Sequence, residues 1–148
     1  MSRDVGGWEA EWGLGRLVGE WSFERTIRGQ GCMTGVAVVE PVGDGRMNYR
    51  ESGELRLEDG QRLRGEQRYV YERLDQGFAV RFHGTGELFH RVMFRWGEGG
   101  LWKASAEHTC KADVYVSEYV FRGDGTFSVE HVVRGPRKDY VIATCYRR

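Results

Sequence analysis

Turn signals recur along this chain at short intervals, and they constrain its fold more than any other feature. Glycine accounts for 22 of the 148 residues, whereas proline accounts for 2. The glycines cluster at Gly29–Gly31, Gly43–Gly45, Asp59–Gly60, Gly84–Gly86, Gly97–Gly100 and Gly123–Gly125. Between these clusters lie segments of roughly 8–12 residues that are rich in Val, Phe, Tyr and Trp. This spacing is typical of short antiparallel strands and predicts an all-β sandwich or barrel.

About ten strands are expected in one domain that spans residues 1–148. Their expected positions are 18–28, 31–41, 46–58, 61–73, 77–83, 87–96, 100–109, 111–122, 126–134 and 138–147. So many consecutive antiparallel strands expose an edge unless the sheet closes, which favours an up-and-down β-barrel over a sandwich. A short N-terminal helix is expected near residues 8–18, with Trp8 and Trp12 covering one end of the barrel.

Alternation along the predicted strands places polar side chains on the inner face. In residues 46–58 and in the next strand, the outer positions are mainly charged, and a hairpin through Asp59-Gly60 joins the two strands. The inner positions are Met47, Tyr49, Glu51, Gly53, Leu55, Leu57, Leu63, Gly65, Gln67, Tyr69 and Tyr71. Tyrosine, glutamine and glutamate on this face indicate a lined cavity and not an apolar core.

The second half of the chain continues this pattern. His90 is expected to point inward, since Arg91 and Arg95 mark the opposite face, and Phe89 falls on the outer side. The other strands group His108 with Cys110, Asp113 with Tyr115, Ser117, Tyr119 and Phe121, and Lys138 with Tyr140, Ile142, Thr144 and Tyr146. Parity leaves open which face of residues 111–121 points inward. His83 and His131 are interpreted as loop or surface residues.

Composition excludes several classes of function. Lys+Arg and Asp+Glu balance at 22 each, so no net field attracts nucleic acid or an anionic membrane. No apolar run reaches the ~20 residues of a membrane span, and the N-terminus lacks a signal-peptide hydrophobic region, so a cytosolic protein is expected. The 3 cysteines are consistent with reduced thiols. The sequence leaves the oligomeric state open.

Leu17-Val18-Gly19-Glu20-Trp21 resembles the Gly-x-Trp motif that begins the first strand of lipocalins and other calycins. The resemblance implies that Trp21 packs across the closed end of the barrel beside an arginine of the last strand, either Arg147 or Arg148.

Nearly the whole chain also resembles an uncharacterised lipocalin-like family of unknown function. The matching positions are Tyr49-x-Glu51-x-Gly53, Tyr69-x-Tyr71, Phe89-His90, His108-x-Cys110-x-x-Asp113-x-Tyr115, and Gly135-Pro136-x-Lys138-x-Tyr140 with Thr144 and Tyr146. Membership implies a calycin-type barrel and no established reaction.

Binding of a small amphipathic or partly polar molecule inside the barrel is the leading hypothesis, because tyrosines provide apolar walls with polar tips. The candidate ligand contacts are Tyr49, Glu51, Tyr69, His90, His108, Cys110, Asp113, Tyr115, Lys138 and Tyr140. A cofactor-independent acid–base enzyme of the isomerase, lyase or cyclase type is the alternative, with His108, Asp113 and His90 as catalytic candidates. A third hypothesis is a self-satisfied polar core without a ligand.

No cofactor is predicted. Zinc bound by His90, His108 and Cys110, or haem bound through a histidine, remains a less favoured alternative, since the sequence has no paired ligand spacing and no haem motif.

Overall fold

The structure, a computed structural model, describes residues 14–96 and 101–148. A 3-10 turn, η1 (Leu14–Leu17), precedes ten strands. The strands are β1 (Gly19–Ile27), β2 (Gly31–Gly43), β3 (Arg46–Leu57), β4 (Arg62–Leu74), β5 (Gly77–Phe82), β6 (Leu88–Trp96), β7 (Trp102–Cys110), β8 (Asp113–Phe121), β9 (Phe127–Arg134) and β10 (Asp139–Arg147). Each lies within two residues of its expected position, so the ten-strand prediction is confirmed.

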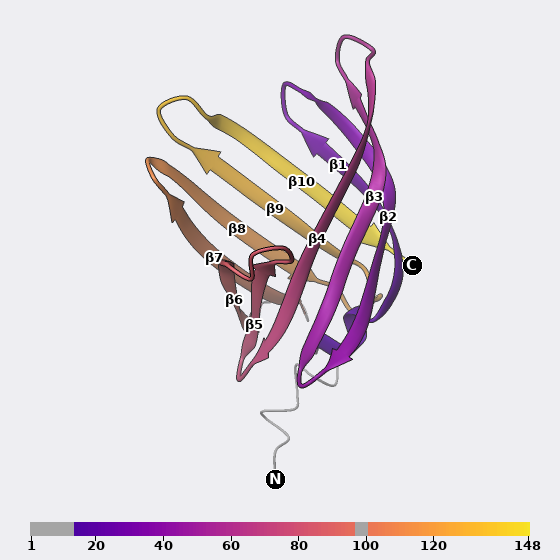
Figure 1. The fold of residues 1–148 in the computed structure, drawn as a ribbon, viewed down its shortest axis with the longest axis vertical. Helices are drawn as coiled ribbons and strands as arrows, with labels where there is room; N and C mark the ends of the chain where they lie inside the picture. Colours follow the sequence, from indigo (N-terminus) through magenta and orange to yellow (C-terminus); the bar gives the residue numbers. More distant parts are fainter. Residues whose placement is uncertain (1–13, 97–100) are drawn as a thin grey trace.

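The strands form a closed antiparallel barrel in which each pairs with its neighbours in sequence and β1 pairs with β10 (Figure 1). The up-and-down prediction is therefore confirmed. Five turns, at 28–30, 58–61, 83–87, 111–112 and 135–138, lie at what we call the cavity end; the opposite end is the Trp21 end. Of the predicted N-terminal helix, residues 8–13 lie outside the described residues, and 14–17 form η1.

A row of glycines lets three neighbouring strands curve sharply. Phe23 of β1 pairs with Gly35 of β2, which pairs with Gly53 of β3, which pairs with Gly65 of β4. A Cβ at Gly35 or Gly53 would collide with the backbone of the adjacent strand. Glycine within strands marks such bends in barrels. At the end of this row Gly65 faces the interior, where a Cβ would lie 3.1 Å from Met33 Cε.

Aromatic side chains fill the barrel towards the Trp21 end. Phe127 stacks on Tyr146 with ring centroids 4.3 Å apart, and Trp21 meets Phe127 edge-on at 4.9 Å. Phe78 and Phe121 are fully buried in the same core. These rings close one end of the interior, so any internal space lies towards the cavity end.

The Trp21 end is capped by Arg148. Its guanidinium carbon lies 3.9 Å from the centroid of the Trp21 ring, and its nitrogens donate to the carbonyl oxygens of Val18 and Arg16. The predicted contact between Trp21 and a C-terminal arginine is present, and Arg148, not Arg147, makes it.

Replacing Arg148 by alanine is expected to lower the free energy of unfolding by about 1–2 kcal/mol, because a cation–π contact and charged hydrogen bonds to carbonyls are lost together. Arg147→Ala is the matched control, since Arg147 is exposed. It should change stability by less than about 0.5 kcal/mol. Urea unfolding of both variants measures the difference; equal effects would show that the cap does not stabilise the barrel.

The wall of the barrel is incomplete on either side of β5 and β6. β4 pairs with β5 only from Tyr69 to Leu74, so its upper part extends past the end of β5 (Figure 1). β6 pairs with β7 only over Met93–Trp96. A register shift opposite Val80 and Arg81 makes a bulge in β6. The bulge turns Phe89 inward beside His90, so the expected outward position of Phe89 is wrong.

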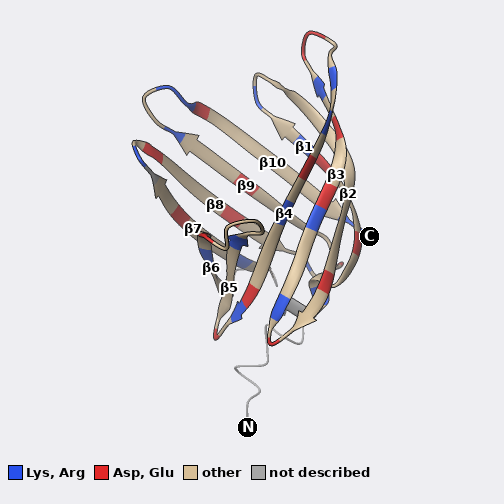
Figure 2. Ribbon diagram, viewed as in Figure 1, with Lys and Arg blue, Asp and Glu red and all other residues tan. Residues whose placement is uncertain are grey.

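Charged residues of both signs are spread over the strands and turns, and neither sign gathers in one region of the view (Figure 2). Within residues 14–96 and 101–148, no helix is long and apolar enough to cross a membrane.

Candidate functional site

A cavity of about 300 Å³ lies inside the barrel between the aromatic core and the cavity end. It is lined by polar and aromatic side chains from β1, β3, β4, β6, β8, β9 and β10, with Gly65 leaving space on the β4 side. The lining comprises Arg25, Ile27, Met33, Tyr49, Glu51, Leu55, Gly65, Glu66, Gln67, Tyr69, Tyr71, Val80, Phe89, Tyr119, Val129, His131, Ile142, Thr144 and Tyr146. The volume falls at the lower end of the range for small-molecule sites, about 300–1,000 Å³.

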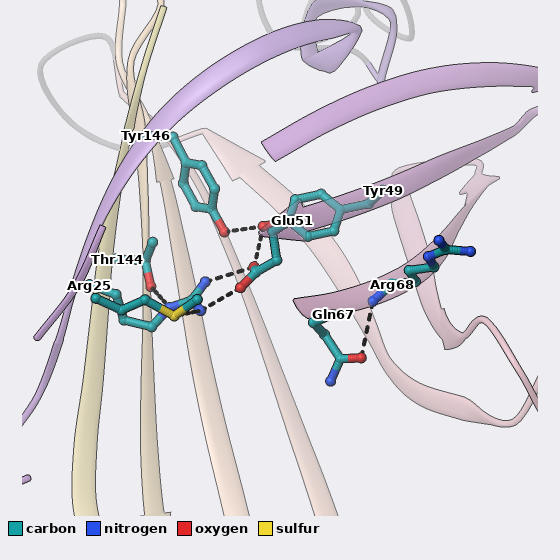
Figure 3. A network of polar contacts seen from close by, with 8 residues as sticks. Arg25, Tyr49, Glu51, Gln67, Arg68, Thr144 and Tyr146 are labelled. Atoms are coloured by element: carbon teal, nitrogen blue, oxygen red, sulfur yellow. Dashed lines mark hydrogen bonds and ion pairs between the residues drawn. The ribbon is translucent and has the colours of Figure 1, made fainter. Parts of the chain in front are cut away.

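A buried ion pair forms one wall of this cavity (Figure 3). Arg25 of β1 donates two hydrogen bonds to Glu51 of β3, from Nη1 to Oε2 at 2.6 Å and from Nη2 to Oε1 at 2.8 Å. Its Nε donates to Thr144 Oγ1 at 2.9 Å, and Nη1 also lies 3.6 Å from Met33 Sδ. Such bidentate pairing fixes the orientation of both groups.

Two tyrosines extend the ion pair into a chain of hydrogen bonds. The Tyr49 hydroxyl donates to Glu51 Oε1 at 2.6 Å and lies 2.8 Å from the Tyr146 hydroxyl (Figure 3). Since the Tyr49 proton is directed to Glu51, Tyr146 is the donor in the second bond. The carboxylate thus accepts from three donor groups, and its charge is compensated within the network.

Local electrostatics keep Arg25 charged and the phenols neutral. Burial lowers the pKa of the Arg25 guanidinium, but hydrogen bonding to Glu51 and the nearby Tyr146 hydroxyl outweigh it, so the net shift is upward. Burial raises the pKa of Tyr49 and Tyr146, and burial together with Glu51 raises the pKa of Tyr69 to about 12. At neutral pH these tyrosines are therefore hydrogen-bond donors and not phenolates.

Two histidines at the back of the cavity are held in the neutral form. His90 Nε2 lies 2.9 Å from the Tyr119 hydroxyl, and His131 Nδ1 lies 2.6 Å from Ser117 Oγ. Burial, with His131 and His108 adding a smaller effect, lowers the pKa of His90 to about 3. Burial, with a smaller effect from Arg25, lowers the pKa of His131 to about 4. His90 Nδ1 is buried without a hydrogen-bond partner among the described residues.

Around the ion pair the interior is thus polar but carries no net charge at neutral pH, because Arg25 and Glu51 cancel and both histidines are neutral. The other carboxylate of the lining, Glu66, is exposed on β4. A second charge placed beside the ion pair would lack a partner in a medium of low dielectric constant. This part of the cavity can accommodate an uncharged group that contacts aromatic rings and forms a few hydrogen bonds.

Of the ten predicted ligand contacts, Tyr49, Glu51 and Tyr69 line the cavity. His90 lies behind the lining, stacked on Phe89 at 4.2 Å. Tyr140 is half-buried on β10 and is not part of the lining, and the side chain of Cys110 lies outside those the structure describes.

Three other predicted contacts meet at the rim of the barrel, and we call them the rim cluster: Asp113, Tyr115 and Lys138. Lys138 Nζ lies 3.3 Å from Asp113 Oδ2 and donates to the Tyr115 hydroxyl at 3.3 Å. Hydrogen bonding to Tyr115 and to Asp113 raises the pKa of the Lys138 ammonium. His108 is near this group, with its ring centroid 6.1 Å from that of Tyr115. The open question about residues 111–121 is answered, since Ser117, Tyr119 and Phe121 are buried.

Most of the lining residues were absent from the predicted ligand contacts, among them Arg25, Phe89 and His131. The surface interpretation of His131 is wrong, because His131 is half-buried and lines the cavity. The sequence contains the pattern that predicts an inward position, because His131 falls on the same face of its strand as Phe127, Val129 and Val133. His83 is exposed in the turn after β5, as expected.

Among the side chains that the structure describes, no three His, Cys, Asp or Glu residues are placed to hold a metal ion. The less favoured zinc alternative that includes Cys110 is not tested, because the side chain of Cys110 lies outside those that the structure describes.

Residues 17–148 match a family of unknown function, DUF6314. The chain belongs to this family. The match extends from the last residue of η1 through all ten strands, so the whole barrel is the family's domain. No curated protein matches the sequence.

Several solved β-barrels are similar in outline. One is a redesigned barrel, mFAP1, bound to DFHBI, with 10% identity and a TM-score of 0.42 over 90% of this chain and 96% of the other. EF1p2_mFAP2b bound to DFHBI has 11% identity and a TM-score of 0.41 over 90% and 94%. A redesigned barrel, b11L5F_LGL, has 10% identity and a TM-score of 0.42 over 90% and 92%. At TM-scores below 0.5, these likenesses carry no information about a ligand of this DUF6314 member.

Proposed function

We propose that this protein binds a small, partly polar molecule in the barrel cavity. The observation that carries the proposal is the cavity of about 300 Å³ lined by the Arg25–Glu51–Tyr49–Tyr146 network on one side and aromatic rings on the other. For scale, an engineered apolar cavity of about 150 Å³ binds benzene, so this space suits a body of about two rings. A lipocalin-like relationship is supported by the contact of Arg148 with Trp21.

Two hydroxyls provide polar contacts for such a ligand. Tyr69 and Tyr71 both line the cavity from β4, and both hydroxyls are neutral donors at neutral pH, with that of Tyr69 also hydrogen-bonded to Gln67. The aromatic rings of Tyr69 and Phe89 lie nearly parallel, with centroids 6.1 Å apart. An aromatic or alicyclic body with one or two acceptor atoms fits both features.

The acid–base enzyme is less well supported by this geometry. His108 and Asp113, two of its three candidates, are not part of the cavity lining. The third, His90, has a pKa lowered by burial to about 3, which makes its imidazole a weak base. The hypothesis of a filled polar core is weakened by the cavity itself.

Gly65→Leu tests the proposal, with N-phenyl-1-naphthylamine, an uncharged fluorescent probe, as the ligand. A side chain at Gly65 points towards Met33 Cε, 3.1 Å from a Cβ built there, and occupies part of the cavity. We expect wild-type protein to bind the probe saturably and the variant to bind it at least about tenfold more weakly. Fluorescence titration measures both dissociation constants.

The matched control is Gly123→Leu, which makes the same change in the exposed turn between β8 and β9, where a Cβ meets nothing within 4 Å. It should bind the probe like wild type. Thermal unfolding of both variants verifies that they are folded. Equal binding of the probe by the two variants would contradict the proposal. Failure of the wild-type protein to bind the probe would contradict it as well.

A further inference from the structure

A second hollow adjoins the cavity through the incomplete wall beside β4. This groove has a volume of about 340 Å³ and is lined by Glu66, Gln67, Arg68, Phe82, His83 and Gly84. Glu66 and Gln67 line the cavity as well. The two hollows therefore meet at one point of β4, where β5 has already ended and no strand closes the wall.

Gln67 lies where the cavity and the groove meet. Its Oε1 accepts a hydrogen bond at 3.0 Å from the backbone N–H of the next residue, Arg68 (Figure 3). That N–H lies on the part of β4 that has no partner in β5, and the glutamine side chain takes the place of a neighbouring strand. Gln67 therefore lines both the cavity and the groove while its amide oxygen is bonded to the backbone of β4.

The groove also differs from the cavity in charge. Arg68 has no carboxylate partner among the described residues, and the residue opposite it on β3, Arg50, pairs with Glu40 at 3.5 Å. Hydrogen-bond donors from Arg68 and His83 face a single carboxylate, that of Glu66. Inside the barrel, in contrast, the guanidinium of Arg25 is fully engaged by Glu51 and Thr144.

We propose that this groove is an outer subsite, which binds the acidic end of an elongated ligand whose uncharged body lies in the cavity. The inference rests on the proposed function and specifies its ligand as an acidic amphiphile. A carboxylate or sulfonate inside the barrel would lie beside Glu51 without a partner. In the groove the same group would contact the Arg68 guanidinium and water.

Two probes with the same ring system test this inference. N-phenyl-1-naphthylamine is uncharged, and 8-anilinonaphthalene-1-sulfonate adds one anionic group to the same rings. Arg68→Gln is expected to raise the dissociation constant of the sulfonate about fivefold and to leave that of the uncharged probe unchanged. Glu66→Gln is expected to lower the dissociation constant of the sulfonate, because the only carboxylate of the groove is removed.

Arg64→Gln is the matched control, since Arg64 lies on the same exposed face of β4 outside the groove. It should leave both constants unchanged, and raising the salt concentration should weaken only the sulfonate in wild type. An Arg68→Gln variant that binds the sulfonate like wild type overturns the outer subsite even when the uncharged probe still binds. Uncharged-probe binding that is insensitive to Gly65→Leu overturns the cavity site, and the outer subsite with it.

Discussion

Replacing Glu51 by glutamine is expected to lower the free energy of unfolding by about 3–5 kcal/mol, the range for breaking a buried ion pair from one side. The glutamine keeps the shape of the side chain and can still accept from Tyr49. It removes the negative charge that compensates Arg25, whose side chain is only 17% exposed. Against a total stability of about 5–15 kcal/mol, this loss is large. Urea unfolding followed by tryptophan fluorescence measures it.

The matched control for Glu51→Gln lies on the same strand. Glu54 points outward from β3, is 42% exposed and approaches Arg62 only to 3.8 Å. Glu54→Gln should therefore change stability by less than about 1 kcal/mol. The double variant Arg25→Gln with Glu51→Gln should lose less than the sum of the two single losses, since neither charge is then left unpaired. Comparable effects at Glu51 and Glu54 would contradict the ion pair as a stabilising element.

Alternation along one strand predicts the face on which Arg25 lies but not the residue with which it pairs. Arg25 falls in step with Trp21, Phe23 and Ile27, so the sequence does place it on the inner face. Its partner, however, lies two strands away, on β3. The inward position of β2 between Met33 and Ala37 is Gly35, which has no side chain, and Arg25 reaches past it to Glu51. Such a contact depends on the curvature of the barrel and not on local pattern.

The strands themselves follow from local pattern, because turn glycines and period-two alternation act within a few residues. Glu51, Tyr49 and Tyr69 were predicted to line the interior for the same reason, and they do line the cavity. Phe89 was missed because the bulge in β6 adds one residue and breaks the alternation. His131 was interpreted as a loop or surface residue although the alternation of its strand is regular. Its inward position could therefore have been predicted from the sequence.

The rim cluster illustrates a different limit. The spacing of Asp113, Tyr115 and Lys138 marks them as unusual strand residues, but spacing does not tell a ligand contact from an ion pair across β9. A Cβ at Gly135 would collide with the Asp113 carboxylate, so glycine in this turn makes room for the pair. Whether the rim cluster contacts the ligand remains a prediction.

Acidification from pH 7 to pH 5 is expected to destabilise the barrel by about 4 kcal/mol through His90 and His131 alone. Burial holds the pKa of His90 at about 3 and that of His131 at about 4, whereas both titrate near 6.5 in the unfolded chain. Below pH 6.5 the unfolded state therefore binds more protons than the folded state, and stability falls as pH falls. Each histidine contributes on the order of 2 kcal/mol at pH 5, and the loss continues until pH approaches the folded pKa.

The groups around these rings favour the neutral form. His90 is hydrogen-bonded to the Tyr119 hydroxyl and lies near His108 and His131. Arg25 adds a positive charge near His131. Among the described residues, no carboxylate contacts either imidazole ring. His90→Gln and His131→Gln keep a hydrogen-bonding side chain without a titrating ring, so each should remove about half of the pH dependence. His83→Gln, in an exposed turn, is the control and should leave the dependence unchanged. The free energy of unfolding of wild type and of a variant that carries both His90→Gln and His131→Gln is measured at pH 7, 6 and 5. A wild-type curve no steeper than that of this double variant would mean that the two buried histidines are charged in the folded barrel.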